Sequence, residues 1–283
     1  MELILIQIIL VVTCRVTPYH KIKRGRIVDG ENATAGQFPY MISLSIVVNQ
    51  TVMKHLCGGT ILTTSWSVTA AHCIDDEIEI LIKYKYIKMV GNTLIYTKNY
   101  KQHDIDCYEI HPKFGNEFGN DIALIRVEQP FNGHYEKAIA LPPSNFKYVI
   151  GTKVIIIGWG HLDQEGTKSD LLRYTEVRLI DDFSCKRAYQ TGKTRELNSD
   201  IMVCAGDDTH KNTACFGDSG GPLIQESNQS GESYQIGITS FGRNCIPFPV
   251  VFTRITAYLD WINDIQCRHE SSCKNNIFEN RNT

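Results

Sequence analysis

One stretch organises the whole sequence: Ala214–Leu223, which reads ACFGDSGGPL. Three glycines and a proline surround Ser219, a composition that is typical of a tight turn whose backbone N–H groups point at one spot instead of joining a sheet. If a serine oxygen attacks a carbonyl, the oxygen that becomes negative needs such preorganised donors. We therefore predict that Ser219 is a nucleophile and that the N–H groups of Gly217 and Ser219 form an oxyanion hole. The alternative is a glycine-rich surface turn without a function.

A serine hydroxyl is a weak nucleophile at neutral pH, so a base must take its proton and a third group must hold that base. Two upstream stretches supply candidates: VTAAHC at 68–73 contains His72, and NDIALI at 120–125 contains Asp121. Alone, each of these residues would more often satisfy only local hydrogen bonds. Together with the turn around Ser219 they resemble the chymotrypsin/trypsin family of serine endopeptidases, whose catalytic triad follows the chain order His, Asp, Ser.

The resemblance runs from Ile27 to about Ile265 and includes five further motifs in the family's order: IVDG at 27–30, CGGT at 57–60, GWG at 158–160, SFG at 240–242 and YLDWI at 258–262. Two positions depart from the family pattern. The family usually has glycine where this chain has Asp29, and commonly tryptophan where it has Phe241. Neither departure touches the chemistry.

Short alternating strands with polar turns follow the first of these motifs, and from the residues alone they form only two clusters. The first cluster is expected at 41–48, 57–62, 67–70, 78–82, 86–90, 93–97, 105–110 and 122–127, and the second at 154–159, 172–180, 202–205, 222–225, 234–240 and 250–253. Apolar residues at helical spacing predict a helix over 255–265. The resemblance implies an all-β fold of two antiparallel six-stranded β-barrels with a C-terminal α-helix, and an active site between the barrels.

The N-terminal residues look like a processed leader. Leu3–Val12 is apolar except for Gln7. This stretch is too short to span a bilayer, but its length is typical of the core of a signal peptide. We therefore interpret residues 1–17 as a signal peptide that directs secretion. A buried strand or helix is the alternative. The basic stretch 21–26 is interpreted as the cleavage site at the end of an activation propeptide, 18–26. The alternative is that this stretch is a solvated tail without a function. The protease domain is expected over 27–267, followed by a C-terminal tail over 268–283.

The resemblance also implies how the precursor is activated. Cleavage after Arg26 by a trypsin-like protease would free the α-amino group of Ile27, which would fold inward and pair with Asp218. A buried carboxylate without a partner is costly, so this pair would form as a unit and order the oxyanion loop. The uncleaved precursor should therefore be inactive.

Ten cysteines indicate an oxidising compartment. By resemblance, Cys57 pairs with Cys73, Cys185 with Cys204, and Cys215 with Cys245, while Cys14 leaves with the signal. We further predict that Cys107 bonds Cys267 or Cys273, because in the family fold its strand runs near the C-terminal helix. The remaining cysteine would be free or intermolecular.

Specificity should depend on a pocket walled by 213–216, 240–242 and Val250. The predicted substrate-binding residues are Thr213, Phe216, Ser240, Phe241, Gly242 and Val250. Trypsin-like members have an aspartate where this chain has Thr213, and a hydroxyl cannot neutralise a buried cation, so lysine and arginine substrates should be poor. Val250 stands where the family usually has glycine, and its methyl groups favour an apolar side chain of moderate size. The alternative is that these residues only pack and that loops select the substrate.

Composition excludes several other classes of function. With 29 basic against 31 acidic residues, nothing suggests a nucleic-acid partner. No continuous apolar run of membrane-spanning length follows the signal, so no membrane partner is expected. No cofactor or metal is expected either: the polar cluster of His103, Asp104, Asp106, Cys107 and His111 alternates between strand faces, and the region of the family's calcium loop has no carboxylate at Gly91 or Asn92. Sequons at Asn32, Asn49 and Asn228 predict glycosylation.

The sequence thus predicts a secreted, monomeric serine endopeptidase that cuts after apolar residues of protein or peptide substrates and that protein inhibitors can block. One alternative is a catalytically silent homologue that acts as a binding or cofactor module. Such relatives typically lose the serine or the histidine, whereas this chain keeps His72, Asp121 and Ser219. Another is a narrow processing protease of a cascade.

Overall fold

The computed structural model describes residues 30–47, 53–117, 119–163, 165–190, 197–207, 213–226, 231–242 and 248–269. The first half of the chain contributes β2 (Met41–Val47), β3 (Met53–Ile61), β4 (Trp66–Thr69), β5 (Ile87–Gly91), β6 (Lys101–Ile110) and β7 (Ala123–Val127). The second half contributes β8 (Lys153–Gly158), β9 (Arg173–Ile180), β10 (Met202–Gly206), β11 (Pro222–Glu226), β12 (Ser233–Phe241) and β13 (Val250–Arg254). A short strand, β1 (Glu31–Asn32), precedes them.

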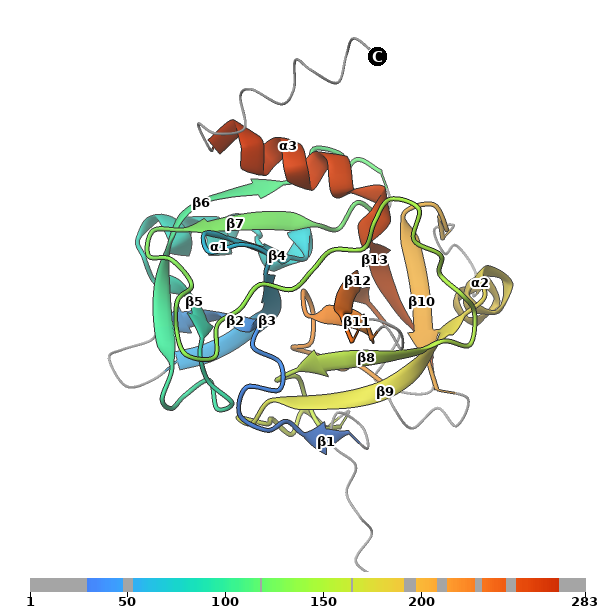
Figure 1. Ribbon diagram of the computed structural model, residues 1–283, viewed down its shortest axis with the longest axis horizontal. Coiled ribbons are helices and arrows are strands. Elements are labelled where there is room, and N and C mark those ends of the chain that lie inside the picture. The colour runs from blue at the N-terminus through green and yellow to red at the C-terminus, as the bar shows by residue number, and fades with distance from the viewer. Residues whose placement is uncertain are drawn as a thin grey trace, which may run out of the picture.

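These strands form two antiparallel barrels, the first on the left and the second on the right of Figure 1. The first closes in the order β2-β3-β4-β7-β6-β5. The second runs β9-β10-β13-β12-β11-β8 and closes because β8 also pairs with β9, while β1 adds to the outer edge of β9. The predicted fold class of two six-stranded barrels is confirmed.

Alternating side chains build each barrel core, as the pleat of a strand requires. Along β9 the buried residues Arg173, Thr175, Val177 and Leu179 alternate with more exposed ones. Trp66 and Leu124 are fully buried in the first barrel, and Phe252 and Leu223 are fully buried in the second. Each barrel therefore has its own apolar centre.

Two sequence-based strand assignments are wrong. Residues 78–82 belong to a helix, α1 (Asp76–Lys83), because Asp75 caps its N-terminus by accepting a hydrogen bond from the Ile78 N–H at 2.9 Å. Acidic residues in the first turn of α1 favour the same helix through its dipole. Residues 93–97 form no strand, and Ile95 makes only isolated bridges to Lys98 and Leu171. A second helix that was not predicted, α2 (Asp182–Tyr189), begins after Asp181.

The predicted C-terminal helix is confirmed as α3 (Leu259–His269), which follows a short 3₁₀ turn. Its buried side chains Ile262 and Ile265 join the core cluster of the first barrel, and Figure 1 shows α3 lying across β6 and β7. Within the described residues, no helix combines the length and the apolar character that crossing a membrane requires.

Two predicted disulfides are present, Cys57–Cys73 and Cys185–Cys204. Cys215 is also disulfide-bonded, and its predicted partner Cys245 lies outside the described residues.

The predicted bridge between Cys107 and Cys267 is not formed. The two cysteines do lie on neighbouring elements, because Glu109 of β6 is 3.6 Å from His269 at the end of α3. However, Cys107 is a free thiol that packs against the core of the first barrel, while the Cys267 sulfur contacts Asn263 of its own helix at 3.8 Å. Cys273 lies outside the described residues.

Candidate active site

His72 and Asp121 form a close pair at the edge of the first barrel. His72 lies in the 3₁₀ turn Ala71–Cys73 that follows β4, and Asp121 precedes β7, the strand that pairs with β4. The Nδ1–Oδ2 distance between their side chains is 2.7 Å, and the backbone N–H of His72 donates to Oδ1 at 2.9 Å. A carboxylate only accepts, so Nδ1 carries the proton and Nε2 remains available as a base.

The second barrel holds Asp121 from the other side. Ser240 at the end of β12 donates its hydroxyl to Asp121 Oδ2 at 2.5 Å, and Thr253 of β13 donates to the Asp121 carbonyl at 2.7 Å. Asp121 is only 6% exposed, so these bonds replace the water that its charge would otherwise need. The base is thus oriented by groups from both barrels.

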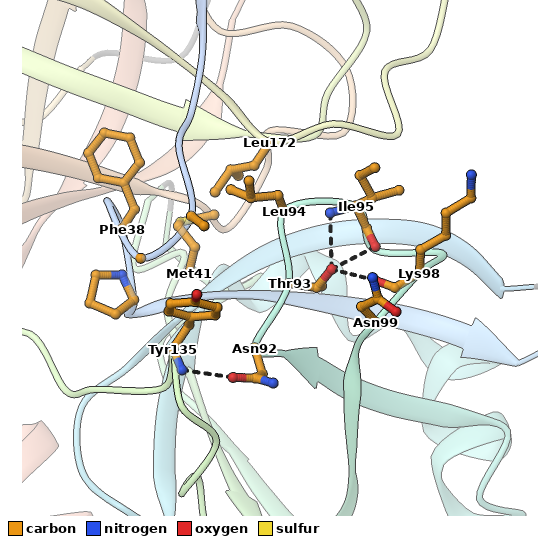
Figure 2. A pocket seen from close by; sticks show the side chains of 13 residues that line it. Phe38, Met41, Asn92, Thr93, Leu94, Ile95, Lys98, Asn99, Tyr135 and Leu172 are labelled. Atoms are coloured by element: carbon orange, nitrogen blue, oxygen red, sulfur yellow. Dashed lines mark hydrogen bonds between the residues drawn. The ribbon is translucent and has the colours of Figure 1, made fainter.

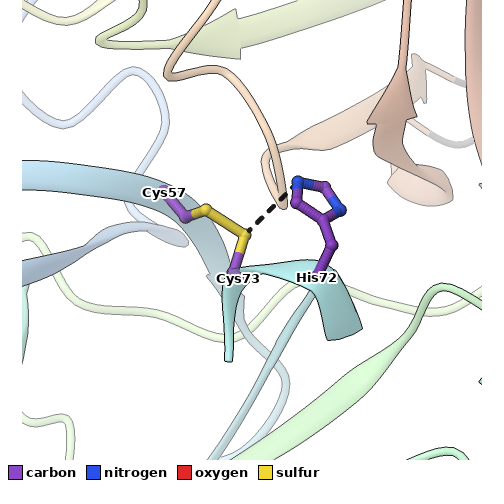
Figure 3. A group of neighbouring side chains, drawn as sticks. All are labelled: Cys57, His72 and Cys73. Atoms are coloured by element: carbon purple, nitrogen blue, oxygen red, sulfur yellow. Dashed lines mark hydrogen bonds between the residues drawn. A yellow bond between two sulfur atoms is a disulfide. The ribbon is translucent and has the colours of Figure 1, made fainter. Parts of the chain in front are cut away.

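Two opposing influences act on the pKa of His72. Burial lowers it, but the hydrogen bond and the negative charge of Asp121 outweigh the burial, so the pKa is raised above the ordinary value. The imidazole lies beside the Cys57–Cys73 disulfide, with Nε2 at 3.9 Å from the Cys73 sulfur (Figure 3). The disulfide ties the His72 turn to β3.

Ser219 is half-buried in a turn between Ala214 and β11, which packs directly against the first barrel. Its carbonyl accepts the Gly58 N–H at 2.7 Å. At the next residue, Gly220, any Cβ would come within 2.5 Å of the Gly58 carbonyl and 3.1 Å of the Ala70 nitrogen. This close approach requires glycine and brings the turn to the chain segment that leads into His72. In the described part of the molecule Ser219 makes no hydrogen bond to His72, a contact that often tightens only when substrate binds.

The backbone of this turn contains the Gly217 and Ser219 N–H groups, for which an oxyanion hole stays a prediction. Gly217 has φ of 96°, a conformation that favours glycine. The neighbouring amides are engaged, since the N–H of Asp218 donates to the Cys215 carbonyl at 3.0 Å and the N–H of Gly220 donates to the Thr239 carbonyl at 2.8 Å. By contrast, the N–H groups of Gly217 and Ser219 have no acceptor within the described residues.

A second histidine, His55 of β3, contacts the backbone of the Ser219 turn. This residue was not predicted from the sequence. Its Nε2 lies 2.7 Å from the Gly217 carbonyl, and its Nδ1 lies 2.6 Å from the Ser43 hydroxyl. Because a carbonyl only accepts, Nε2 carries the proton, and Ser43 donates to Nδ1. Burial lowers the pKa of His55 to about 4, so the ring is neutral at pH 7. It packs among Tyr96 and Trp159, with ring centroids 5.6 and 5.8 Å away.

Asp218 is completely buried beneath the turn. It accepts the N–H groups of Gly160 and Cys215, each at 2.9 Å. Burial raises its pKa to about 6, although both backbone hydrogen bonds oppose that shift. Its predicted partner Ile27, with Arg26, lies outside the described residues, so the activation pair stays a prediction.

A cavity of about 210 Å³ opens beside Ser219. Its walls are Ala214, Cys215, Phe216, Ser219, Thr239, Ser240, Phe241, Gly242 and Val250. Thr239 is an addition to the predicted set. Thr213 does not border the cavity: it is 2% exposed, and its hydroxyl turns to the Ala214 carbonyl at 3.2 Å. None of the described side chains that line it carries a charge.

The polar cluster on β6 is divided among separate partners. His103 is fully buried and contacts Glu136 at 2.9 Å, whereas Asp104 pairs with Lys88 and Asp106 with Arg126. Among the described residues, a different group has metal-like spacing, namely Cys57, Cys73 and His72. Its two sulfurs are bonded to each other, so they do not fit a metal that needs thiolate ligands.

One of the three sequons lies within the described residues. Asn32 is exposed on β1, where its side-chain oxygen accepts a hydrogen bond from Arg173. Asn49 and Asn228 lie outside the described residues, so glycosylation stays a prediction at each of the three asparagines.

Comparison with known proteins agrees with this geometry. The family model described as Trypsin matches residues 27–262. The chain is 31% identical over 246 residues to Serine proteinase stubble of Drosophila melanogaster. That match covers 84% of this chain but 30% of the relative, so the chain spans under a third of that protein's length.

Proposed function

The chain belongs to the trypsin family of serine proteases, and from that premise we propose that it is a secreted endopeptidase that cleaves protein or peptide substrates through an acyl-enzyme at Ser219. The observation that carries this proposal is the pairing of His72 with Asp121 across from a serine turn whose Gly217 and Ser219 N–H groups have no acceptor within the described residues. A binding module has no need of such donors.

Each group has one role in the proposed reaction. His72 Nε2 takes the proton of the Ser219 hydroxyl as its oxygen attacks the scissile carbonyl, and the resulting oxyanion accepts hydrogen bonds from the two free N–H groups. His72 then gives that proton to the leaving amine, which departs and leaves the acyl group on Ser219. Water repeats the sequence and releases the acid. Asp121 keeps the proton on Nδ1 and stabilises the imidazolium that forms.

We propose that the chain is made as a zymogen. Cleavage after Arg26 by a trypsin-like protease would supply the Ile27 amino group as a counter-ion for Asp218, whose complete burial makes its charge costly when alone. A secretory signal over 1–17, glycosylation and inhibition by protein inhibitors fit the same setting.

Activation and labelling test this proposal directly. The full chain should react with a fluorophosphonate probe only after limited treatment with trypsin, and Ser219→Ala should abolish the labelling without changing the fold. A cleaved protein that binds partners but never reacts with the probe would instead support the catalytically silent homologue.

The cavity beside Ser219 supports a preference for apolar residues of moderate size. Its volume of about 210 Å³ exceeds the roughly 150 Å³ that holds a benzene ring, and the described residues that line it are uncharged. Val250 is 2% exposed and narrows it. We expect Val250→Gly to raise kcat/KM for phenylalanine substrates relative to valine substrates by about tenfold. This is the change in discrimination that roughly one or two methylene groups in a pocket produce. Peptide-library profiling measures this, and dominant cleavage after arginine would contradict the proposed specificity.

A further inference from the structure

A second cavity of about 420 Å³ lies outside the catalytic cleft, and we call it the distal pocket. Four parts of the chain supply its walls: residues 35–41, which lead into β2, the 92–99 loop after β5, Tyr135, and Leu172 (Figure 2). The volume falls within the range of roughly 300 to 1,000 Å³ that is typical of ligand sites.

The floor of the distal pocket is apolar. Phe38, Met41 and Leu172 are each at most 7% exposed, so their positions are set by packing beneath the cavity. Figure 2 shows the Tyr135 ring beside Met41, with Leu94 and Leu172 opposite. Tyr135 also lines the distal pocket and is 37% exposed.

The loop that forms the other wall is held rigidly. The Thr93 hydroxyl accepts the Ile95 N–H at 3.0 Å and lies 2.6 Å from the Lys98 carbonyl. Asn92 and Asn99 both adopt positive φ, of 60° and 53°, a conformation that asparagine tolerates better than most residues. Asn92 Oδ1 also accepts the Tyr135 N–H at 2.7 Å and joins the two walls. The pocket therefore needs little ordering when a ligand enters.

The rim of the distal pocket carries a positive charge at Lys98. Among the described residues, Lys98 is the only charged one that lines the pocket; it is exposed and has no ion pair there. The amides of Asn92 and Asn99 add polar groups to the same rim. The surface thus combines an apolar hollow with one positive charge, which complements an apolar side chain next to a carboxylate.

The distal pocket adjoins the catalytic machinery. Trp159 donates its indole N–H to the Leu94 carbonyl at 3.0 Å, and the next residue, Gly160, donates its N–H to Asp218 at 2.9 Å. The loop wall is therefore two hydrogen bonds from the Ser219 turn. An extended substrate segment rises about 3.3 Å per residue, so the number of residues between the cut bond and the docked segment decides whether one polypeptide spans both places.

We propose that the distal pocket is a docking site for protein substrates, which it recognises by a segment with a large apolar side chain followed by an acidic residue. This inference rests on the proposed protease function and names how that enzyme would select its substrates. Tethering the substrate at a second point raises its effective concentration at Ser219 without altering the bond that is cut.

Binding tests the proposal without catalysis. The full chain carrying Ser219→Ala is titrated, by fluorescence anisotropy, with labelled peptides of glycine and serine that contain a central Phe-Asp, Phe-Lys or Ser-Asp pair. We expect Phe-Asp to bind about tenfold more tightly than either comparison peptide, the usual value of one complementary charge or one buried ring. Lys98→Glu should reverse the preference between Phe-Asp and Phe-Lys.

Two further variants locate the binding. Ala35→Trp places a large ring at an exposed edge of the distal pocket and should abolish the Phe-Asp preference, whereas Lys54→Glu, a charge reversal at an exposed lysine on β3 outside the pocket, should not. If Phe-Asp binding survives both Lys98→Glu and Ala35→Trp, or if the three peptides bind alike, the proposal is overturned.

Hydrolysis separates this inference from the proposed function. In the activated enzyme, Lys98→Glu should leave the cleavage of a short apolar substrate unchanged but lower kcat/KM about tenfold for the same substrate joined to a Phe-Asp segment by a flexible linker. Equal loss on both substrates would assign Lys98 to the cleft instead of a docking site. Failure to cut either substrate with wild-type residues would contradict the protease function itself.

Discussion

Two histidines of the first barrel, His72 and His55, differ in almost every physical respect. His72 has a side chain that is 36% exposed, its partner is the carboxylate of Asp121, and its pKa is raised. His55 is packed between rings, its partners are the hydroxyl of Ser43 and the carbonyl of Gly217, and its pKa is lowered to about 4.

The difference shows that the partner, more than the residue type, decides what an imidazole does. A carboxylate favours the imidazolium and prepares His72 to accept a proton near neutral pH. The hydrogen bond to the Gly217 carbonyl opposes the lowering of the His55 pKa by burial but does not outweigh it, so His55 stays uncharged and holds the backbone of Gly217 in place. One histidine suits chemistry and the other suits positioning.

The largest expected effect comes from removing the carboxylate that distinguishes the two histidines. Asp121→Asn should lower kcat by about 10⁴-fold, the loss that is typical of this triad when the histidine is held in the wrong tautomer. The acid limb of kcat/KM should move to lower pH because the raised pKa of His72 depends on its hydrogen bond with Asp121 and on the charge of Asp121. Full activity with asparagine at this position would show that another group orients His72.

The next effect concerns stability, where His55 and Asp218 act in opposite directions in the uncleaved chain. His55 has a pKa of about 4 when folded against 6.5 unfolded, so the folded state binds fewer protons and loses stability as pH falls through this window. Asp218 has a pKa of about 6 when folded against 3.8 unfolded, so it gains stability over nearly the same interval. Each contribution is about 3 kcal/mol.

Two neutral replacements separate these contributions. His55→Gln keeps a donor and an acceptor but cannot titrate, and relative to the wild type it should gain about 3 kcal/mol on acidification from pH 6.5 to pH 4. Asp218→Asn should lose about the same amount relative to the wild type over that window. Urea unfolding at both pH values measures the two, and parallel pH profiles for all three proteins would contradict the assigned shifts.

The smallest effect comes from the hydroxyl that sets the His55 tautomer. Ser43→Ala removes a fully buried hydroxyl and leaves Nδ1 of His55 without its donor, so it should lower the free energy of unfolding by about 1 to 3 kcal/mol. Because the Nε2 bond to Gly217 remains, kcat should fall less than tenfold. Denaturant titration and steady-state kinetics on one preparation check both expectations. Ser65→Ala, in a loop of the same barrel, serves as the matched control.

Much of the fold and of the cleft could be predicted from local sequence. Glycines around Ser219 indicate a turn because few other residues allow the conformation of Gly217 or the contact at Gly220. Period-two alternation located most strands. Alternation failed at 78–82, where a short apolar run is compatible with either helix or strand, and the deciding signal was the capping residue Asp75.

Features that depend on distant residues could not be predicted. His55 follows a lysine in an ordinary strand, and its partner Gly217 is 162 residues away. Thr213 was expected in the specificity pocket from its spacing to Ser219, but spacing does not determine the direction of a side chain. The distal pocket has no motif, because its walls come from segments with no common pattern.

Each end of the described domain packs on the barrel that is farther from it in the sequence. β1 precedes the first barrel in the chain yet pairs with β9 of the second, and α3 follows the second barrel yet buries Ile262 and Ile265 in the core of the first. Each half therefore completes its structure only while the other is intact. Thermal unfolding should consequently be a single cooperative transition. The two barrels should not move relative to each other at their interface, where the proposed triad lies.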